Sequence, residues 1–140
     1  MGADPEGSVN LEAALSSLAA PVKLVLFPQT FGCDTCVPTR QVIDRVASFS
    51  EKISVEEYNL VLDKDKVKAY GVLRVPAIAV VGQVDVGIRF YGVPEGHELI
   101  SLVESVLLVA SGNSGLSEDS QRLIASVDHP IDVQVFATPT

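Results

Sequence analysis

The two cysteines of the chain, Cys33 and Cys36, are separated by two residues and lie between a predicted strand and a predicted helix. The preceding run, 22–27, is short, mostly apolar and bounded by prolines, which indicates a buried strand. In the following segment, 37–49, apolar residues recur at three- and four-residue spacing, as they do in an amphipathic helix. The sequence therefore predicts a strand, a CxxC motif and a helix in direct succession.

This placement favours redox chemistry at the two sulfur atoms. The N-terminus of a helix favours an anion, because its first backbone N–H groups are unpaired and its dipole is positive there. We therefore expect Cys33 to form a thiolate and to act as the nucleophile, and Cys36, one turn later and more buried, to resolve a mixed disulfide. A structural pair and a metal site are the alternatives, although one CxxC supplies only half of a tetrahedral zinc site.

The residues between the cysteines are expected to modulate the motif. The carboxylate of Asp34 opposes a nearby thiolate, or it complements the positive end of the helix. Thr35 either tunes the motif or is a solvated first-turn residue. Catalytic use of His97 and His129 is not expected, because one lies at a predicted helix start and the other precedes a proline.

The composition excludes several classes of function. The 140 residues carry a formal charge of -8 without a cluster of Lys and Arg, which argues against nucleic-acid binding. The acidic residues lack the His or Cys neighbours of a metal site, so we predict no metal and no cofactor besides the redox-active disulfide. The apolar stretch 99–110 is too short to span a membrane, and residues 1–10 lack the features of a secretory signal, so a cytoplasmic location is expected.

Periodicity and turn residues predict the remaining elements. A first helix over 9–20 precedes the CxxC unit and is expected to cover the sheet. After that unit come a strand at 53–62, a helix at 63–70, two strands at 77–81 and 84–91 joined by a tight turn at 82–83, and a helix at 95–111. The order βαβαββα predicts an α/β fold with a mixed central sheet flanked by helices.

This order, with a CxxC after the first strand and Val75-Pro76 ahead of the hairpin, resembles the thioredoxin fold over residues 21–111. The resemblance implies that Pro76 follows a cis peptide bond and faces the CxxC. It also implies that Val75 offers its backbone to an extended substrate segment and that Gly92 lines the same groove. One departure is Phe27, six residues before Cys33, where thioredoxins place a buried carboxylate, so the proton acceptor is unassigned.

The C-terminal region repeats the beginning of the unit. A predicted helix at 117–127, then Pro130 and a strand-like run at 131–137, match the earlier order of helix, proline and strand at one constant offset. We therefore divide the chain into an N-terminal extension and helix (1–20), a thioredoxin-like domain (21–112) and the start of a truncated second unit (113–140). The isolated strand is expected to be disordered or to associate with another chain, including a second copy.

Together with the CxxC, the segments 74–76 and 91–98 and the run 136–140 resemble the archaeal and thermophilic bacterial protein disulfide oxidoreductases, which contain two thioredoxin units. The resemblance implies a thiol:disulfide oxidoreductase that acts on protein disulfides and is recycled by a thioredoxin-reductase-like flavoprotein. Two alternatives stay open. One is a non-catalytic thioredoxin-like scaffold that supports an active second unit, and the other is an electron-transfer domain of a peroxide-reducing flavoprotein system.

Overall fold

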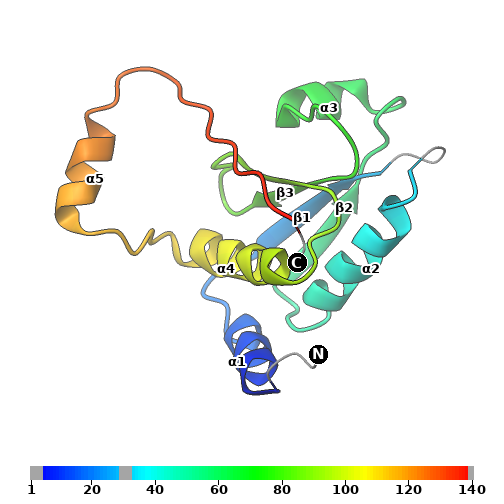
Figure 1. Ribbon diagram of the computed structural model, residues 1–140, viewed down its shortest axis with the longest axis horizontal. Coiled ribbons are helices and arrows are strands. Elements are labelled where there is room, and N and C mark those ends of the chain that lie inside the picture. Colours follow the sequence, from blue (N-terminus) through cyan, green and yellow to red (C-terminus); the bar gives the residue numbers. More distant parts are fainter. Residues whose placement is uncertain (1–4, 29–32, 139–140) are drawn as a thin grey trace.

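A computed structural model describes residues 5–28 and 33–138 of the chain. Figure 1 shows a central sheet with helices on both sides. The elements are, in order, α1 (Pro5–Ser16), β1 (Val22–Phe27), α2 (Cys36–Ala47), β2 (Ile53–Glu57), α3 (Lys64–Tyr70), β3 (Ala77–Val81), β4 (Ile88–Tyr91), α4 (His97–Ser111) and α5 (Glu118–Ala125). The βαβαββα order predicted for 21–111 is confirmed, and β1 has the predicted bounds.

The four strands described form one mixed sheet in the order β2-β1-β3-β4. β1 pairs with β2 in parallel and with β3 antiparallel, and β4 continues the antiparallel half. Side chains alternate between the two faces of each strand, so β1 contributes Leu24 and Leu26 to one face and Val25 and Phe27 to the other. This alternation determines which strand residues can reach the CxxC motif.

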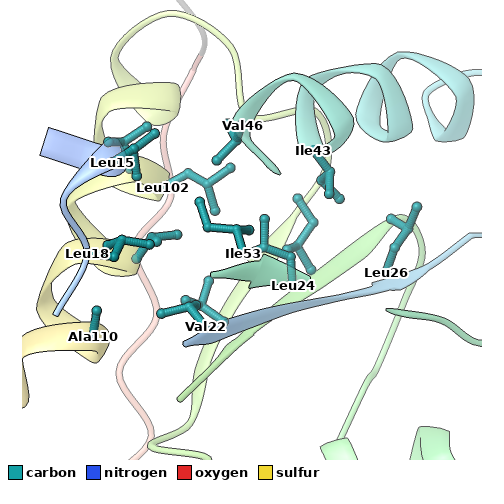
Figure 2. Packing of buried hydrophobic residues seen from close by; sticks show 14 residues of the cluster. Leu15, Leu18, Val22, Leu24, Leu26, Ile43, Val46, Ile53, Leu102 and Ala110 are labelled. Atoms are coloured by element: carbon teal, nitrogen blue, oxygen red, sulfur yellow. The ribbon is translucent and has the colours of Figure 1, made fainter. Parts of the chain in front are cut away.

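The larger core lies on the face covered by α2 and α4. Figure 2 shows side chains from α1, α2, α4 and the sheet pointing toward one another in this core. α2 contributes one stripe at helical spacing, which includes Ile43 and Val46, and α4 contributes a second stripe, which includes Leu102. The first helix was expected to cover the sheet. It packs against α4, and Leu15 of α1 and Leu18 after it join the core with residues of the sheet.

A smaller core lies on the opposite face, under α3. Phe27 is fully buried there, with its ring 5.9 Å from that of Tyr58 and 5.7 Å from that of Tyr70. Arg89 links β4 to α3 on this face, because its Nε donates to the backbone carbonyl of Tyr70 at 2.9 Å. α3 therefore rests on an aromatic cluster, on the side of the sheet away from α2 (Figure 1).

Two predicted strands are shorter than expected because side chains close turns. The strand predicted at 53–62 ends at Glu57, since the Asn59 carboxamide oxygen accepts from the backbone N–H groups of Val61 and Leu62. The predicted tight turn at 82–83 is wrong. Residues 82–87 form a longer connection, in which Asp85 accepts from the N–H of Gly87, and β4 begins only at Ile88.

The C-terminal region begins with α5, which lies away from the domain. Figure 1 shows α5 separated from the sheet, with the following segment returning toward it. The predicted strand at 131–137 is wrong, since residues 131–138 have no regular structure and are exposed. A strand needs a neighbour to pair its backbone groups, and residues 131–137 do not pair with any of the four strands of the described sheet. In the described part of the chain, no helix is both long and apolar enough to cross a membrane.

Candidate active site at one edge of the sheet

Strand pairing brings the predicted site residues to one edge of the sheet. The last residues of β1 and β2 are neighbours, with Leu26 opposite Glu57. The end of β1 also meets the start of β3, with Phe27 opposite Ala77, the residue that follows Pro76. Ala77 in turn lies opposite Tyr91, the residue before Gly92. The CxxC segment, which follows β1, therefore shares this edge with Pro76 and Gly92.

Cys33 and Cys36 form a disulfide bond, with their Cα atoms 5.5 Å apart. Cys33 is half-buried, whereas Cys36 is only 6% exposed. The helix was expected to leave Cys33 at its N-terminus, but α2 begins at Cys36 and Thr35 is its N-cap. Cys33 lies in the turn before the helix, and its carbonyl accepts from the N–H of Cys36 at 3.4 Å. The more exposed cysteine is therefore the one that precedes the helix.

Thr35 and Asp34 occupy the turn between the sulfur atoms. The Thr35 Oγ1 lies 4.0 Å from the Cys33 Sγ, at the limit of a hydrogen bond to sulfur. The Thr35 carbonyl is held by α2, because it accepts from both the hydroxyl and the N–H of Thr39, at 2.6 and 3.0 Å. Asp34 is exposed. Thr35 is therefore placed to interact with Cys33, while Asp34 faces solvent.

The peptide bond between Val75 and Pro76 is cis, as the resemblance to thioredoxins implied. Pro76 is buried and its carbonyl accepts from the N–H of Gly92 at 3.0 Å. Gly92 has a φ of +89°, which a residue with a Cβ rarely adopts. Val75 is half-buried, and the guanidinium of the preceding Arg74 stacks 4.4 Å from the centre of the Tyr91 ring. Pro76 and Gly92 are thus joined directly by their backbones.

A pocket of about 340 Å³ lies beside the buried cysteine. Its lining combines apolar side chains with four polar ones and consists of Leu26, Pro28, Cys36, Val37, Arg40, Gln41, Glu57 and Asn59. Arg40 forms an ion pair with Glu57 across this pocket. The sequence analysis did not single out Arg40 or Glu57. The alternation of β2 was the available signal, since Ile53 and Val55 are core residues on the α2 face, and Glu57 follows them at the same two-residue spacing.

The structure also changes the interpretation of Phe27. Sequence counting from Cys33 had placed this residue at the position of the buried carboxylate of thioredoxins, but Phe27 lies on the α3 face, away from Cys36. Leu26 is the β1 residue that lines the pocket with Cys36. Neither histidine is among the residues that line this pocket. His97 is an exposed first residue of α4, and His129 is exposed beside Asp128.

Comparison with known proteins places this architecture in a family. No protein-family model matches the chain. The probable thioredoxin of Methanothermobacter thermautotrophicus is 36% identical over 72 residues, which are 51% of this chain and 80% of that protein. The thioredoxin of Methanocaldococcus jannaschii is 29% identical over 87 residues, which are 61% of this chain and 96% of that protein. Both relatives are short, and the chain covers most of each.

Solved structures agree in fold. A protein disulfide oxidoreductase from Aeropyrum pernix superposes with a TM-score of 0.75 and 25% identity, over 90% of this chain and 56% of that one. The NTD_N/C domain of the alkylhydroperoxide reductase AhpF from Enterococcus faecalis gives the same TM-score and identity, over 89% of this chain and 61% of that domain. The chain therefore spans little more than half the length of these two structures. On its sequence, its fold and its disulfide-linked CxxC pair, the chain belongs to the thioredoxin family of thiol-disulfide oxidoreductases.

Proposed function

We propose that the dithiol form of the Cys33–Cys36 pair reduces disulfides of other proteins and becomes the disulfide seen in the structure. The thiolate of Cys33 attacks one sulfur of the substrate, and the other sulfur leaves as a thiolate. The thiolate of Cys36 then attacks the Cys33 sulfur, which forms the Cys33–Cys36 bond and releases the second substrate thiol. The substrate gains two electrons and the CxxC pair loses two.

The difference in exposure between the two cysteine residues carries this assignment. A nucleophile must be reached by a bulky protein substrate, and Cys33 is half-buried, whereas Cys36 is 6% exposed and lies within the first turn of α2. The hydroxyl of Thr35, 4.0 Å from the Cys33 sulfur, supports a thiolate at this position when it turns its proton toward the sulfur. Exposure and hydrogen bonding favour the same cysteine.

Val75, Pro76 and Gly92 are proposed to hold the substrate chain. They share the sheet edge with the CxxC segment. The hydrogen bond from the N–H of Gly92 to the Pro76 carbonyl holds these two residues together. The backbone of the half-buried Val75 is proposed to pair with an extended segment of the substrate. Asp34, exposed next to Cys33, is proposed to temper the thiolate by charge repulsion.

The wider cellular setting is also a proposal. A thioredoxin-reductase-like flavoprotein is proposed to return the pair to its dithiol form, and a cytoplasmic location fits a chain whose two cysteines both lie in the CxxC motif. Residues 21–112 are proposed as the thioredoxin-like domain. The exposed region after it is proposed as part of a second unit that associates with another chain, because Val133, Val135 and Phe136 are all at least 80% exposed.

A second candidate function is electron transfer within a peroxide-reducing flavoprotein system. The superposition on the AhpF domain, with the same TM-score as the archaeal oxidoreductase, favours it. The two candidates differ in their oxidant. The first requires direct reduction of protein disulfides, whereas the second requires transfer to a peroxidase partner, with slow reduction of an unrelated protein disulfide.

Trapping of mixed disulfides with insulin tests the proposed roles. Reduced wild-type protein is expected to reduce insulin and become oxidised. Cys36→Ser should accumulate a mass equal to protein plus an insulin chain through Cys33, and Cys33→Ser should accumulate none. Intact mass spectrometry after acid quenching measures the mass of each of the three proteins and of its insulin adduct. Equal trapping by both variants would contradict the assigned roles, and wild-type protein that leaves insulin oxidised would favour the electron-transfer candidate.

A further inference from the structure

Glu57 lines the same pocket as the buried Cys36. It is the last residue of β2, opposite Leu26 in the parallel register, and both side chains line the pocket with Cys36. Ile53 and Val55 precede Glu57 at two-residue spacing and pack in the core under α2. Strand alternation therefore directs the Glu57 side chain to the α2 face, where an ion pair with Arg40 holds it.

Arg40 is shared between two carboxylates, so Glu57 can accept a proton without leaving a cation unpaired. The Nε of Arg40 donates to both carboxylate oxygens of Asp44, at 2.9 and 3.0 Å, while its Nη1 donates to the Oε2 of Glu57. One guanidinium thus faces two carboxylates, which gives the group a net charge of -1. When Glu57 takes up a proton, Arg40 keeps its pairing with Asp44, so no cation loses its counter-ion.

Water can connect the two groups across the pocket. The volume of about 340 Å³ is large enough for several water molecules, and Gln41 and Asn59 add polar side chains to its lining. The Glu57 side chain is 48% exposed, so a proton that it accepts can pass to bulk solvent. Burial disfavours the charged form of a thiol, and Cys36 is only 6% exposed. Cys36 therefore needs an acceptor close by when it attacks.

We infer that Glu57 is the proton acceptor for Cys36 in the second step of the exchange, and that Arg40 positions its carboxylate. In this step the Cys36 thiol gives its proton to Glu57 through pocket water. The resulting thiolate forms a bond to the Cys33 sulfur, and the bond from that sulfur to the substrate breaks, with its electron pair leaving on the substrate thiolate. The inference rests on the proposed roles of Cys33 and Cys36. The β1 residue that lines the pocket is Leu26, which has no carboxylate, and Glu57 of β2 supplies one.

The neighbouring Glu56 provides a matched control. It lies on the opposite face of β2, where it pairs with Lys23 at 2.9 Å and accepts from the hydroxyl of Tyr58 at 2.8 Å. Among the described residues packed against Glu57, the titratable or charged groups on its own face are Arg40, Asp44 and Cys36 of α2. β1 contributes no charge there, because Lys23 faces Glu56. Substitution of Glu56 thus changes the same charge in the same strand without reaching the pocket.

The second step is measured by rapid mixing of the reduced full-length protein with 5,5′-dithiobis(2-nitrobenzoate). Release of the first nitrothiobenzoate equivalent reports attack by Cys33, and release of the second reports attack by Cys36 on the Cys33 mixed disulfide. We expect Glu57→Gln to slow the second release at pH 7 by about ten-fold or more and to leave the first within about two-fold, since a positioned base typically contributes 10²- to 10⁴-fold. Glu56→Gln should change neither release.

The pH profile separates proton transfer from a structural role. With Glu57 present, the second release should vary little between about pH 6 and 8, because the carboxylate removes the proton. In Glu57→Gln the rate should rise about ten-fold per pH unit, because only thiol already ionised by solvent reacts. Glu57→Asp, which retains the carboxylate, should recover the flat profile at a reduced rate.

Each outcome decides the inference. A second release that is unchanged in Glu57→Gln, or slowed no more than in Glu56→Gln, overturns it while leaving the proposed roles of the cysteines intact. Equal slowing of both releases also overturns it, because Glu57 would then act on the fold or on Cys33. Wild-type protein that releases only one equivalent would overturn both this inference and the proposed function.

Discussion

The close approach of β3 to α4 gives a quantitative test of the fold. Gly82 follows β3 directly, and a Cβ added there would lie 2.6 Å from the Cγ1 of Val109 and 3.3 Å from its carbonyl oxygen. The φ of Gly82 is not positive, so alanine is otherwise compatible with the backbone. The substitution Gly82→Ala therefore tests packing between the sheet and α4, with no contribution from a left-handed conformation.

The contact distances set the expected size of the effect. Ordinary contact for a Cβ begins at 3.4 Å, so the Val109 methyl group must retreat by 3.4 - 2.6 = 0.8 Å. A valine in a helix is nearly fixed in one χ1 rotamer, and the nearby carbonyl limits movement of the backbone. Overpacking costs about 1 to 3 kcal/mol, and replacing glycine by alanine returns about 0.4 to 1 kcal/mol through the unfolded chain. We expect a net loss of about 1 to 2 kcal/mol in the free energy of unfolding.

Urea denaturation of the wild type, Gly82→Ala, Val109→Ala and the double variant measures this coupling. Removing the Cγ1 of Val109 deletes the 2.6 Å contact, so Gly82→Ala should cost at least about 1 kcal/mol less in the Val109→Ala background. A cost below about 0.5 kcal/mol in the wild-type background, or the same cost in both backgrounds, would refute the close approach.

Two further predictions concern the loop before β4 and the groove beside the CxxC. Hydrogen bonds from Arg89 hold the pKa of the Asp85 carboxyl below its ordinary value. The ionised Asp85 therefore stabilises the folded protein above the unfolded pKa of about 3.9, and this contribution is lost as the pH falls through the folded pKa. Asp85→Asn should therefore cost about 1 kcal/mol at pH 7, and this difference, measured by urea denaturation, should shrink below about pH 4, whereas a constant difference would contradict it. Gly92→Ala, at a φ of +89°, should lower the rate with insulin several-fold more than the rate with 5,5′-dithiobis(2-nitrobenzoate), and equal rate losses would argue against a role of Gly92 in the substrate groove.

The regular elements could be predicted from periodicity because burial and local sequence agree there. The run 22–27 is apolar apart from Lys23 and becomes the central strand β1, which lies between two cores. The same agreement holds for α2 and α4, whose buried residues follow the predicted helical spacing. Glycine at positive φ ends α4 at Gly112, as the sequence predicted.

The errors lie where side chains compete with the backbone ladder. Valines at 84 and 86 have high strand propensity, yet they are 68% and 58% exposed, because Asp85 closes a loop with Gly87 and Arg89. Asn59 ends β2 in the same way. Propensity counts the residues of a segment one by one, whereas these turns depend on the partners that a side chain finds after folding.

For the candidate site, the motif could be predicted and its surroundings could not. The spacing of Cys33 and Cys36 predicts a disulfide pair, and the resemblance to thioredoxins implies a cis bond before Pro76. The structure contains both the disulfide and the cis bond. Glu57 and Arg40 are distant in sequence and meet only because α2 packs on the same face of the sheet to which Glu57 points. A single sequence carries no direct signal of that packing.

The alternation of side chains along β1 and β2 determines which residues reach the Cys36 pocket. Phe27 and Leu26 are adjacent, yet Phe27 packs with Tyr58 and Tyr70 under α3, whereas Leu26 reaches the Cys36 pocket. The same alternation on β2 separates Glu56 from Glu57. Counting residues back from Cys33 fixes a position along the chain but not a face of the sheet, and an acid one position away from the right face cannot serve the buried sulfur. An acid–base group for Cys36 must therefore lie on the pocket face of its strand, and the proposed acceptor Glu57 meets this condition.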